Sequence, residues 1–221
     1  MMFDDFMRIK IGQTLFSASA LVVLLWGLGG LRTTHANPNG YLMDIQMVPA
    51  VCALDPSKAR KRKCLEGYSL NIAGLYPLKP EKDCRTQSSA TLPPLQAKVV
   101  AKVMPDQTAR MQLWQAYGGC FGMTASQYFR MIINFADRLN VPLELSAAET
   151  KQIQHQALRT QFLRLNRDLN TNAFHFSCHR LGNQVFLSSV KMCYSKKGTY
   201  QSCPRELLTN CPKTFLIKGS F

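Results

Sequence analysis

The side chains best suited to proton transfer are three histidines, because the ordinary pKa of histidine lies nearest neutral pH. They are His155, His175 and His179, and all three follow the N-terminal region. His175 and His179 have the His-x-x-x-His spacing of a metal-binding pair, but the residues around them favour a strand, and no carboxylate stands beside them. We therefore expect structural or surface roles for these histidines and no bound metal.

A dense run of cations is the second chemical feature of the chain. Five of the six residues at positions 58–63 are basic, namely Lys58, Arg60, Lys61, Arg62 and Lys63. Such a stretch cannot be buried, so it predicts an exposed basic loop that could contact phosphates. The formal charge is +14, of which residues 1–36 contribute only one unit. A surplus this large attracts RNA, DNA, anionic lipid or acidic polysaccharide without choosing among them.

Cysteine usage is typical of a protein from an oxidising compartment. All eight cysteines follow residue 36: Cys52, Cys64, Cys84, Cys120, Cys178, Cys193, Cys203 and Cys211. An even number of cysteines in an exported chain argues for disulfides. A zinc site is disfavoured, because no Cys-x-x-Cys pair occurs and the spacing is irregular.

Residues 1–36 have the composition of a secretory signal peptide. Two cations precede an apolar run over residues 15–31, and small residues stand where a signal peptidase would cleave after Ala36. We expect a mature domain over residues 37–221 that is periplasmic or secreted. An uncleaved membrane anchor is the alternative, since the apolar run approaches the length that spans a bilayer. Translation from Met7 would give a more ordinary signal.

The hydrophobic pattern of the remaining residues predicts both strands and helices. No long linker and no internal repeat interrupts them, which favours one domain. The pattern predicts strands over residues 41–52, 68–72, 174–178, 184–193 and 214–218, a turn over residues 74–80, and helices over residues 95–104, 124–139 and 146–165. The last two helices each begin at a capping box, Thr124-x-x-Gln127 and Ser146-x-x-Glu149.

The helix predicted over residues 146–165 would carry a cationic face. Lys151, His155 and Arg159 follow one another at four-residue spacing, so on a helix they would share one side. Such a face usually serves solvation, and contact with a polyanion is the less favoured interpretation.

Two short motifs resemble the active-site signatures of the ribonuclease T2 family. Residues 70–77 read Leu-Asn-Ile-Ala-Gly-Leu-Tyr-Pro, and residues 114–122 read Trp-Gln-Ala-Tyr-Gly-Gly-Cys-Phe-Gly. The likeness covers about residues 41–221, because it continues in order through residues 103–105, 128–129 and 210–215. It implies an α+β, ribonuclease T2-like fold of the bacterial periplasmic type, with a central antiparallel sheet, packed helices and stabilising disulfides.

The resemblance also implies how the cysteines pair. It joins Cys84 to Cys120, Cys178 to Cys211 and Cys193 to Cys203, which leaves Cys52 for Cys64. Each bridge would contribute about 2 to 4 kcal/mol, mainly by restricting the unfolded chain.

The catalytic residues of the family are replaced at every matching position. In the family, two histidines exchange protons with the RNA 2'-hydroxyl and the leaving oxygen, a glutamate and a lysine stabilise the charged phosphorane, and no metal is needed. These positions fall on Ala73 and Tyr117 for the histidines, Leu113 for the glutamate and Ala116 for the lysine. Alanine and leucine exchange no protons, and the ordinary pKa of tyrosine, about 10, is too high for an efficient base. The resemblance therefore implies a pseudoenzyme without a cofactor.

Three hypotheses for the function follow. The first is a catalytically inactive protein that binds RNA, another polyanion or a protein partner, with Tyr76 and Trp114 either stacking on bases or packing beside the motifs. The second is an active endoribonuclease that cleaves single-stranded RNA through a 2',3'-cyclic phosphate with non-standard catalytic residues. In the third, the cleft is vestigial and a surface patch faces an envelope partner. In each case we expect a monomer with no membrane span once the signal is removed.

Overall fold

Six strands build one sheet in the computed structural model, which describes residues 39–80, 83–207 and 209–220. They are β1 (Tyr41–Met47), β2 (Leu70–Pro77), β3 (Lys151–Gln154), β4 (Phe174–Leu181), β5 (Gln184–Tyr194) and β6 (Thr214–Ile217). Their order is β2-β1-β5-β6-β3, and β4 pairs with β5 off this path. All pairs are antiparallel except β5 and β6, which meet in parallel at Phe186 and Leu216. The predicted α+β class with a central antiparallel sheet is confirmed.

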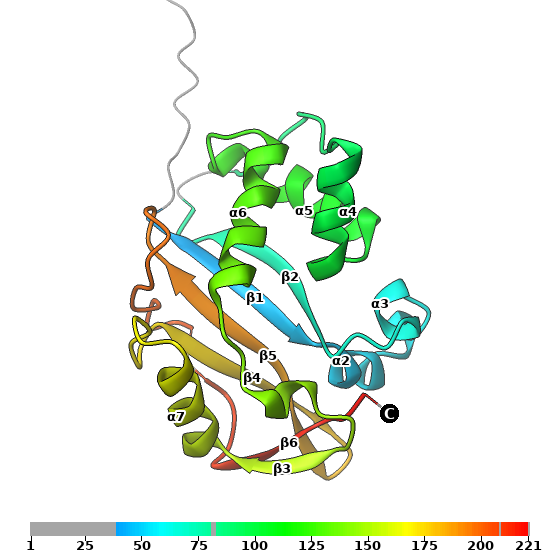
Figure 1. Ribbon diagram of the computed structural model, residues 1–221, viewed down its shortest axis with the longest axis vertical. Coiled ribbons are helices and arrows are strands. Elements are labelled where there is room, and N and C mark those ends of the chain that lie inside the picture. The colour runs from blue at the N-terminus through cyan, green and yellow to red at the C-terminus, as the bar shows by residue number, and fades with distance from the viewer. Residues whose placement is uncertain (1–38, 81–82, 208, 221) are drawn as a thin grey trace, which may run out of the picture. The chain divides into compact units, whose positions relative to one another are not determined.

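Six α-helices pack around this sheet in the described part of the chain (Figure 1). They are α2 (Val48–Leu54), α3 (Arg62–Leu65), α4 (Pro94–Val103), α5 (Gln107–Tyr117), α6 (Ala125–Arg138) and α7 (His155–Leu165). Short 3-10 turns lie at η1 (Pro56–Lys58), η2 (Gly118–Cys120) and η3 (Leu143–Ser146). In Figure 1, α4, α5 and α6 form a group beside β1 and β2, while α7 lies at the other end near β4.

Helix α6 shows how local sequence and core packing agree. The Thr124 hydroxyl accepts a hydrogen bond from Gln127 N, and the Gln127 side chain accepts one from Thr124 N, so the predicted capping box begins the helix. Tyr128, Ile132 and Phe135 then recur at helical spacing and are buried in the core. Burial of side chains of this kind contributes about 1.5–3 kcal/mol each. This apolar face therefore fixes α6 on the sheet.

Strand β1 alternates between the core and a more polar face. Its odd-numbered residues are buried, whereas Leu42, Asp44 and Gln46 point to the other face and are half-buried. On that face Asp44 stands in register with Gly74 of β2 and with Lys191 of β5. Because side chains at matching positions of neighbouring strands lie close together, Asp44 and Lys191 can interact directly across the sheet.

Two predicted boundaries near the first motif are wrong. The strand predicted over residues 41–52 ends at Met47, where α2 begins with Pro49 in its first turn, a position that tolerates the missing N–H of proline. The turn predicted over residues 74–80 starts later, because β2 keeps its pairing with β1 as far as Pro77.

The helix predicted over residues 146–165 is wrong in its first half. Residues Lys151–Gln154 form β3, which pairs antiparallel with β6, and α7 begins only at His155. Ser146 does not cap a helix, because its hydroxyl donates to a carbonyl inside η3. Pairing with β6 satisfies the backbone of these residues, so Lys151 does not share a helical face with His155.

All eight cysteines form disulfides, and the pairing implied by the resemblance is confirmed. The bridges are Cys52–Cys64, Cys84–Cys120, Cys178–Cys211 and Cys193–Cys203. The second of them joins the loop before α4 to η2, directly after α5. It therefore holds that loop against the helix that carries the second motif.

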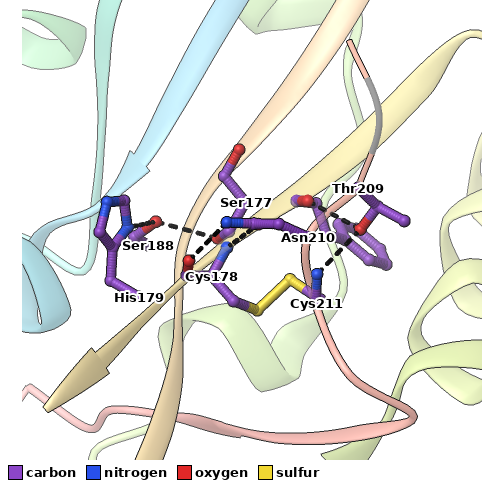
Figure 2. Close-up of a disulfide and its surroundings, with 8 residues drawn as sticks. Ser177, Cys178, His179, Ser188, Thr209, Asn210 and Cys211 are labelled. Atoms are coloured by element: carbon purple, nitrogen blue, oxygen red, sulfur yellow. Dashed lines mark hydrogen bonds between the residues drawn. A yellow bond between two sulfur atoms is a disulfide. The ribbon is translucent and has the colours of Figure 1, made fainter. Parts of the chain in front are cut away.

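The Cys178–Cys211 bridge helps to cover the edge of β4 (Figure 2). The Asn210 side chain accepts a hydrogen bond from Cys178 N at 2.7 Å and donates one to Cys178 O at 2.9 Å. The Thr209 hydroxyl donates to Phe176 O at 2.8 Å. These bonds occupy backbone groups that an exposed edge would otherwise offer to a strand of another chain.

The predictions for the N-terminal region concern residues outside the described part of the chain. The signal peptide predicted over residues 1–36 and its apolar run both lie there. Among the residues that the structure does describe, no helix is both long enough and apolar enough to cross a bilayer.

Candidate functional site

The first motif lies on β2, and Gly74 is its tightest point. A Cβ atom at Gly74 would lie 2.8 Å from Leu113 Cδ1 and 2.9 Å from the hydroxyl oxygen of Tyr76. A side chain there would have to displace the Leu113 or Tyr76 side chain, so β2 and α5, the helix that carries the second motif, approach each other closely. The structure thus brings the two motifs together, as the resemblance implies.

Helix α5 is anchored by Trp114, which serves as a packing residue. Asp106 begins the helix by accepting a hydrogen bond from Ala109 N at 3.0 Å. Trp114 is only 1% exposed, and its Nε1 donates to Ser88 O and to Ser88 Oγ, each at 3.1 Å. A ring buried in this way cannot stack on a base. Of the two interpretations of Trp114, the structure favours packing.

The four replaced positions differ in exposure. Ala73 is half-buried, and Leu113 is 7% exposed because it packs on the glycine of the first motif. The Tyr117 ring meets the Tyr76 ring edge-on, with centroids 5.1 Å apart. Ala116 lies on an exposed side of α5. Two aliphatic side chains and one phenol therefore occupy the place where the two motifs meet.

A hollow of about 210 Å³ opens beside the first motif. We call it the β2 hollow, and it is lined by Gln46, Lys63, Asn71, Ile72, Ala73, Tyr76, Met104, Asp106 and Ala109. The Lys63 ammonium donates to Gln46 Oε1 at 2.6 Å, so the basic run supplies one cation to the hollow. The Asn71 Oδ1 atom is buried without a hydrogen-bond partner among the described residues. Buried acceptors are normally satisfied, so this wall has unmet hydrogen-bonding capacity.

Two further cations of the basic run pair with carboxylates. Lys61 Nζ lies 3.8 Å from Oδ2 of Asp106, which is itself part of the hollow wall. On α3, Arg62 Nε lies 2.5 Å from Oε1 of Glu66, the residue that follows the helix. Exposed pairs of this kind exchange readily for other partners. Lys61 is therefore close enough to the hollow to contact an anion that enters it.

The basic run is partly helical, which corrects the prediction of a plain loop. Residues 56–58 form η1, and α3 begins at Arg62. Arg60 is exposed, and the side chain of Lys58 lies outside the described part of the structure. The five cations are thus spread over η1, the turn of residues 59–61 and α3, and Lys63 is a member of the run that lines the β2 hollow.

Burial is the largest cause of the pKa shifts of two acidic side chains near the hollow, Tyr76 and Asp44. It raises the pKa of Tyr76 to about 12, with smaller contributions from Asp44 and Tyr117. It also raises the pKa of Asp44, against a hydrogen bond with Ser189 and the attraction of two nearby lysines. The Asp44 Oδ1 atom is buried without a partner among the described residues, and Asp44 does not line the hollow. Tyr76 therefore keeps its proton at neutral pH.

No histidine of the described residues lines the β2 hollow. His155 lies at the start of α7 between two phenylalanine rings, and burial, followed by Arg159, lowers its pKa. Burial also lowers the pKa of His175 on β4. His179 Nδ1 lies 2.8 Å from Ser188 Oγ (Figure 2). Within the described residues, His, Cys, Asp and Glu form no group of three that could hold a metal ion.

Sequence patterning does not single out Gln46, Asn71 or Asp106, which all line the hollow. A signal for Gln46 exists, because Asp44 and Gln46 are polar residues at alternate positions of an otherwise apolar strand. Such alternation marks a strand face outside the core. Asn71 and Asp106 carry no comparable signal, since their meeting depends on how β2 and α5 pack.

The backbone is similar to those of solved ribonucleases. Ribonuclease MC1 from bitter gourd seeds aligns over 80% of this chain and 98% of its own, with 15% identity and a TM-score of 0.62. The S3-RNase of Japanese pear aligns over 80% of this chain and 98% of its own, with 17% identity and a TM-score of 0.61. An RNase-related protein from Calystegia sepium aligns over 82% of this chain and 97% of its own, with 14% identity and a TM-score of 0.59. No protein-family model and no curated protein sequence matches the chain. The chain therefore has the ribonuclease T2-like fold, and likeness at such low identity shows the fold alone.

Proposed function

We propose that this protein is an exported pseudoenzyme with a ribonuclease T2-like fold, which binds RNA in the β2 hollow without cleaving it. The observation that carries this proposal is the contact of Lys63 with Gln46 at 2.6 Å, in a hollow where Ala73 stands at the first acid–base position. A cation for phosphate and amides for hydrogen bonding line the hollow, and no histidine among the described residues does.

Single-stranded RNA suits the groups that line the hollow. Lys63 would contact a phosphate, and the amides of Gln46 and Asn71 match the donors and acceptors on the edge of an unpaired base. The formal charge of +14 attracts such a strand from a distance. A mutant of ribonuclease MC1, 14% identical with a TM-score of 0.64, was crystallised with 5'-UMP, which supports a nucleotide as the ligand class.

Among the described residues, the same hollow has no histidine pair for cleaving RNA, and its one carboxylate, Asp106, is engaged by Ala109 N and Lys61. Cleavage through a 2',3'-cyclic phosphate uses a base for the 2'-hydroxyl and an acid for the leaving oxygen, and each such group contributes about a hundred- to ten-thousandfold. Tyr76, with a pKa of about 12, is a poor base at neutral pH. Residues of one catalytic constellation act together, so replacement of the whole set leaves binding as the function of the hollow.

We also propose that residues 1–36 are a cleaved signal peptide and that the domain over residues 37–221 works as a monomer in a bacterial periplasm or outside the cell. Four disulfides support an oxidising compartment, because such bonds persist there and are rare in the cytosol. Sequencing of the exported protein should then begin at Asn37. A chain found in the membrane with residues 1–36 intact would support the anchor alternative.

Cleavage of a fluorescent single-stranded RNA tests the proposal. The oxidised protein is compared with one variant that carries Ala73→His, Leu113→Glu, Ala116→Lys and Tyr117→His together. We expect no cleavage by the unmodified protein and 2',3'-cyclic phosphate products from the variant. Cleavage by the unmodified protein, lost on substitution of one histidine, would support the active endoribonuclease with non-standard residues. Failure to bind RNA even at low salt would favour a surface patch for an envelope partner.

A further inference from the structure

A second cavity lies against helix α5 and shares no lining residue with the β2 hollow. Its volume is about 270 Å³, and it opens between α5 and the loop of residues 87–92. We call it the Arg110 cavity. Its polar wall consists of three hydroxyls, three amides and one cation, from Ser88, Ser89, Thr91, Gln87, Gln107, Gln115 and Arg110.

Arg110 is a buried cation without a carboxylate partner. It is 8% exposed, and its Nη1 donates to Met104 O at 2.7 Å, at the end of α4. No carboxylate among the described residues forms an ion pair with it. The Asp106 carboxylate is engaged elsewhere, because it accepts from Ala109 N and lies 3.8 Å from Lys61. Burial lowers the pKa of Arg110, against the attraction of Asp106, but the guanidinium stays charged at neutral pH.

A buried charge without a counter-ion is costly, so its presence points to a missing anion. The Met104 carbonyl at the end of α4 offers a partial negative charge but not a full one. A guanidinium has five N–H donors in a planar fork, and that of Arg110 makes one hydrogen bond within the described residues. The Arg110 side chain lines the cavity, so its remaining N–H groups are the donors that could bind a ligand there. This fork matches the oxygens of a phosphate or carboxylate.

The loop wall of the cavity is fixed without any ligand. Trp114 Nε1 holds Ser88 through its carbonyl and its hydroxyl, each at 3.1 Å. The Cys84–Cys120 bridge ties the same loop to the end of α5. A wall held in this way loses little conformational freedom when a ligand enters, which favours binding.

We propose that the Arg110 cavity binds a small hydroxylated molecule with one oxyanion group, either a phosphate ester or a carboxylate of a sugar. The oxyanion pairs with Arg110, and the hydroxyls of the ligand bond to Ser89, Thr91 and Gln115. The wall offers one cation and no carboxylate, which matches a single anionic group. A volume of about 270 Å³ lies just below the range of about 300–1,000 Å³ for ligand pockets, so it suits a small molecule better than a nucleic acid strand.

Calorimetric titration of the oxidised protein tests this site independently of RNA binding. The probes are ribose 5-phosphate, gluconate and uncharged ribose. We expect saturable binding of at least one anion and none of ribose, and the preferred anion identifies phosphate or carboxylate as the group. No saturable binding of either anion, or binding of ribose as tight as that of the anions, would overturn the proposal.

Gln115→Glu is the sharpest variant, because it adds a carboxylate to the cavity wall with a side chain of the same shape at an exposed position. We expect anion binding to weaken at least about tenfold, through repulsion and through competition for Arg110. Gln112→Glu adds the same charge on an exposed part of α5 outside the cavity and should change affinity less than about twofold. Equal losses in the two variants would mean that the probe responds to overall charge, which would overturn the assignment.

Discussion

Helix α5 borders two hollows that differ in how their charges are balanced. On the side of β2, Lys63 bonds to Gln46 and shares a wall with the Asp106 carboxylate. On the other side, Arg110 is buried and has no carboxylate partner among the described residues. The β2 hollow is lined by four residues of the first motif, whereas no residue of either motif except Gln115 lines the Arg110 cavity. A buried charged group without a counter-ion can therefore indicate a ligand site that a search for motifs would miss.

Several residues that match the two motifs hold α5 in place. A Cβ atom at Gly118 would lie 2.7 Å from the Trp114 ring, and one at Gly74 would lie 2.8 Å from Leu113. Cys120 bonds the end of the helix to the loop before α4. These contacts fix α5, and residues of that helix line both hollows. A change in the shared support should disturb both sites, while a change in one wall should disturb one.

Trp114→Ala should have the largest effect, because it removes a fully buried ring from α5, the helix that borders both hollows. Truncation of a buried tryptophan costs about 3–5 kcal/mol of unfolding free energy, and Ser88 O would lose its donor. Urea denaturation of the oxidised protein measures this loss. Gln112→Ala, at an exposed position of the same helix, is the control and should stay within about 0.5 kcal/mol. A loss as small as the control's would contradict the packing role of the ring.

Replacement of Cys84 and Cys120 by alanine should have the next largest effect. The bridge closes a sequence separation of 36 residues, and its loss should cost about 2–4 kcal/mol by the same denaturation assay. Binding of ribose 5-phosphate should suffer more than RNA binding, because the tethered loop forms a wall of the Arg110 cavity only. Removal of Cys193–Cys203, with a separation of 10, is the control. If it weakened the sugar phosphate equally, the loop would not be a wall of that site.

Where local pattern and family order agree, the sequence alone predicted the structure well. The disulfide pairing implied by the resemblance is confirmed, because the order of the cysteines along the fold leaves little freedom once the fold is known. Helix α6 could be predicted because the capping box at Thr124 and the buried stripe from Tyr128 point to the same element. The approach of Leu113 and Tyr117 to the first motif follows from the same family likeness.

The features that the sequence could not predict depend on contacts between residues that lie far apart in the chain. Residues 151–154 suit a helix locally, but the edge of β6 pairs with them as a strand. Arg110 lies on a mixed polar helix, where a cation is ordinarily solvated. Its isolation depends on the Asp106 carboxylate turning toward Ala109 N and Lys61, which no local pattern encodes.

Lys63→Ala should separate the two hollows. It removes the cation that lines the β2 hollow, so RNA affinity should fall, and the slope of log affinity against log salt should flatten by about 0.7 for one lost contact with a single strand. Fluorescence anisotropy at several salt concentrations measures both quantities. Ribose 5-phosphate binding should not change. Lys197→Ala removes an exposed cation elsewhere, and the same effect from this variant would show that RNA responds to net charge alone.

Asp44→Asn should have the smallest effect, visible in how stability depends on pH. Because burial raises the pKa of Asp44, the folded protein holds its proton more tightly than the unfolded chain does. The stability that this group contributes is therefore fully present below its unfolded pKa and is lost as pH rises through its folded pKa. Asparagine does not titrate, so the variant escapes that loss.

The difference in melting temperature between Asp44→Asn and the unmodified protein should be near zero at about pH 3 and positive at about pH 7. Asp137→Asn, at an exposed position of α6, is the control and should show no such trend. A negative difference at neutral pH would mean that Lys63 and Lys191 favour the ionised carboxylate by more than burial disfavours it. Asp44 would then be an ionised partner of Lys63, the cation that lines the β2 hollow. Arg110, by contrast, is a buried cation for which no carboxylate among the described residues serves as a partner.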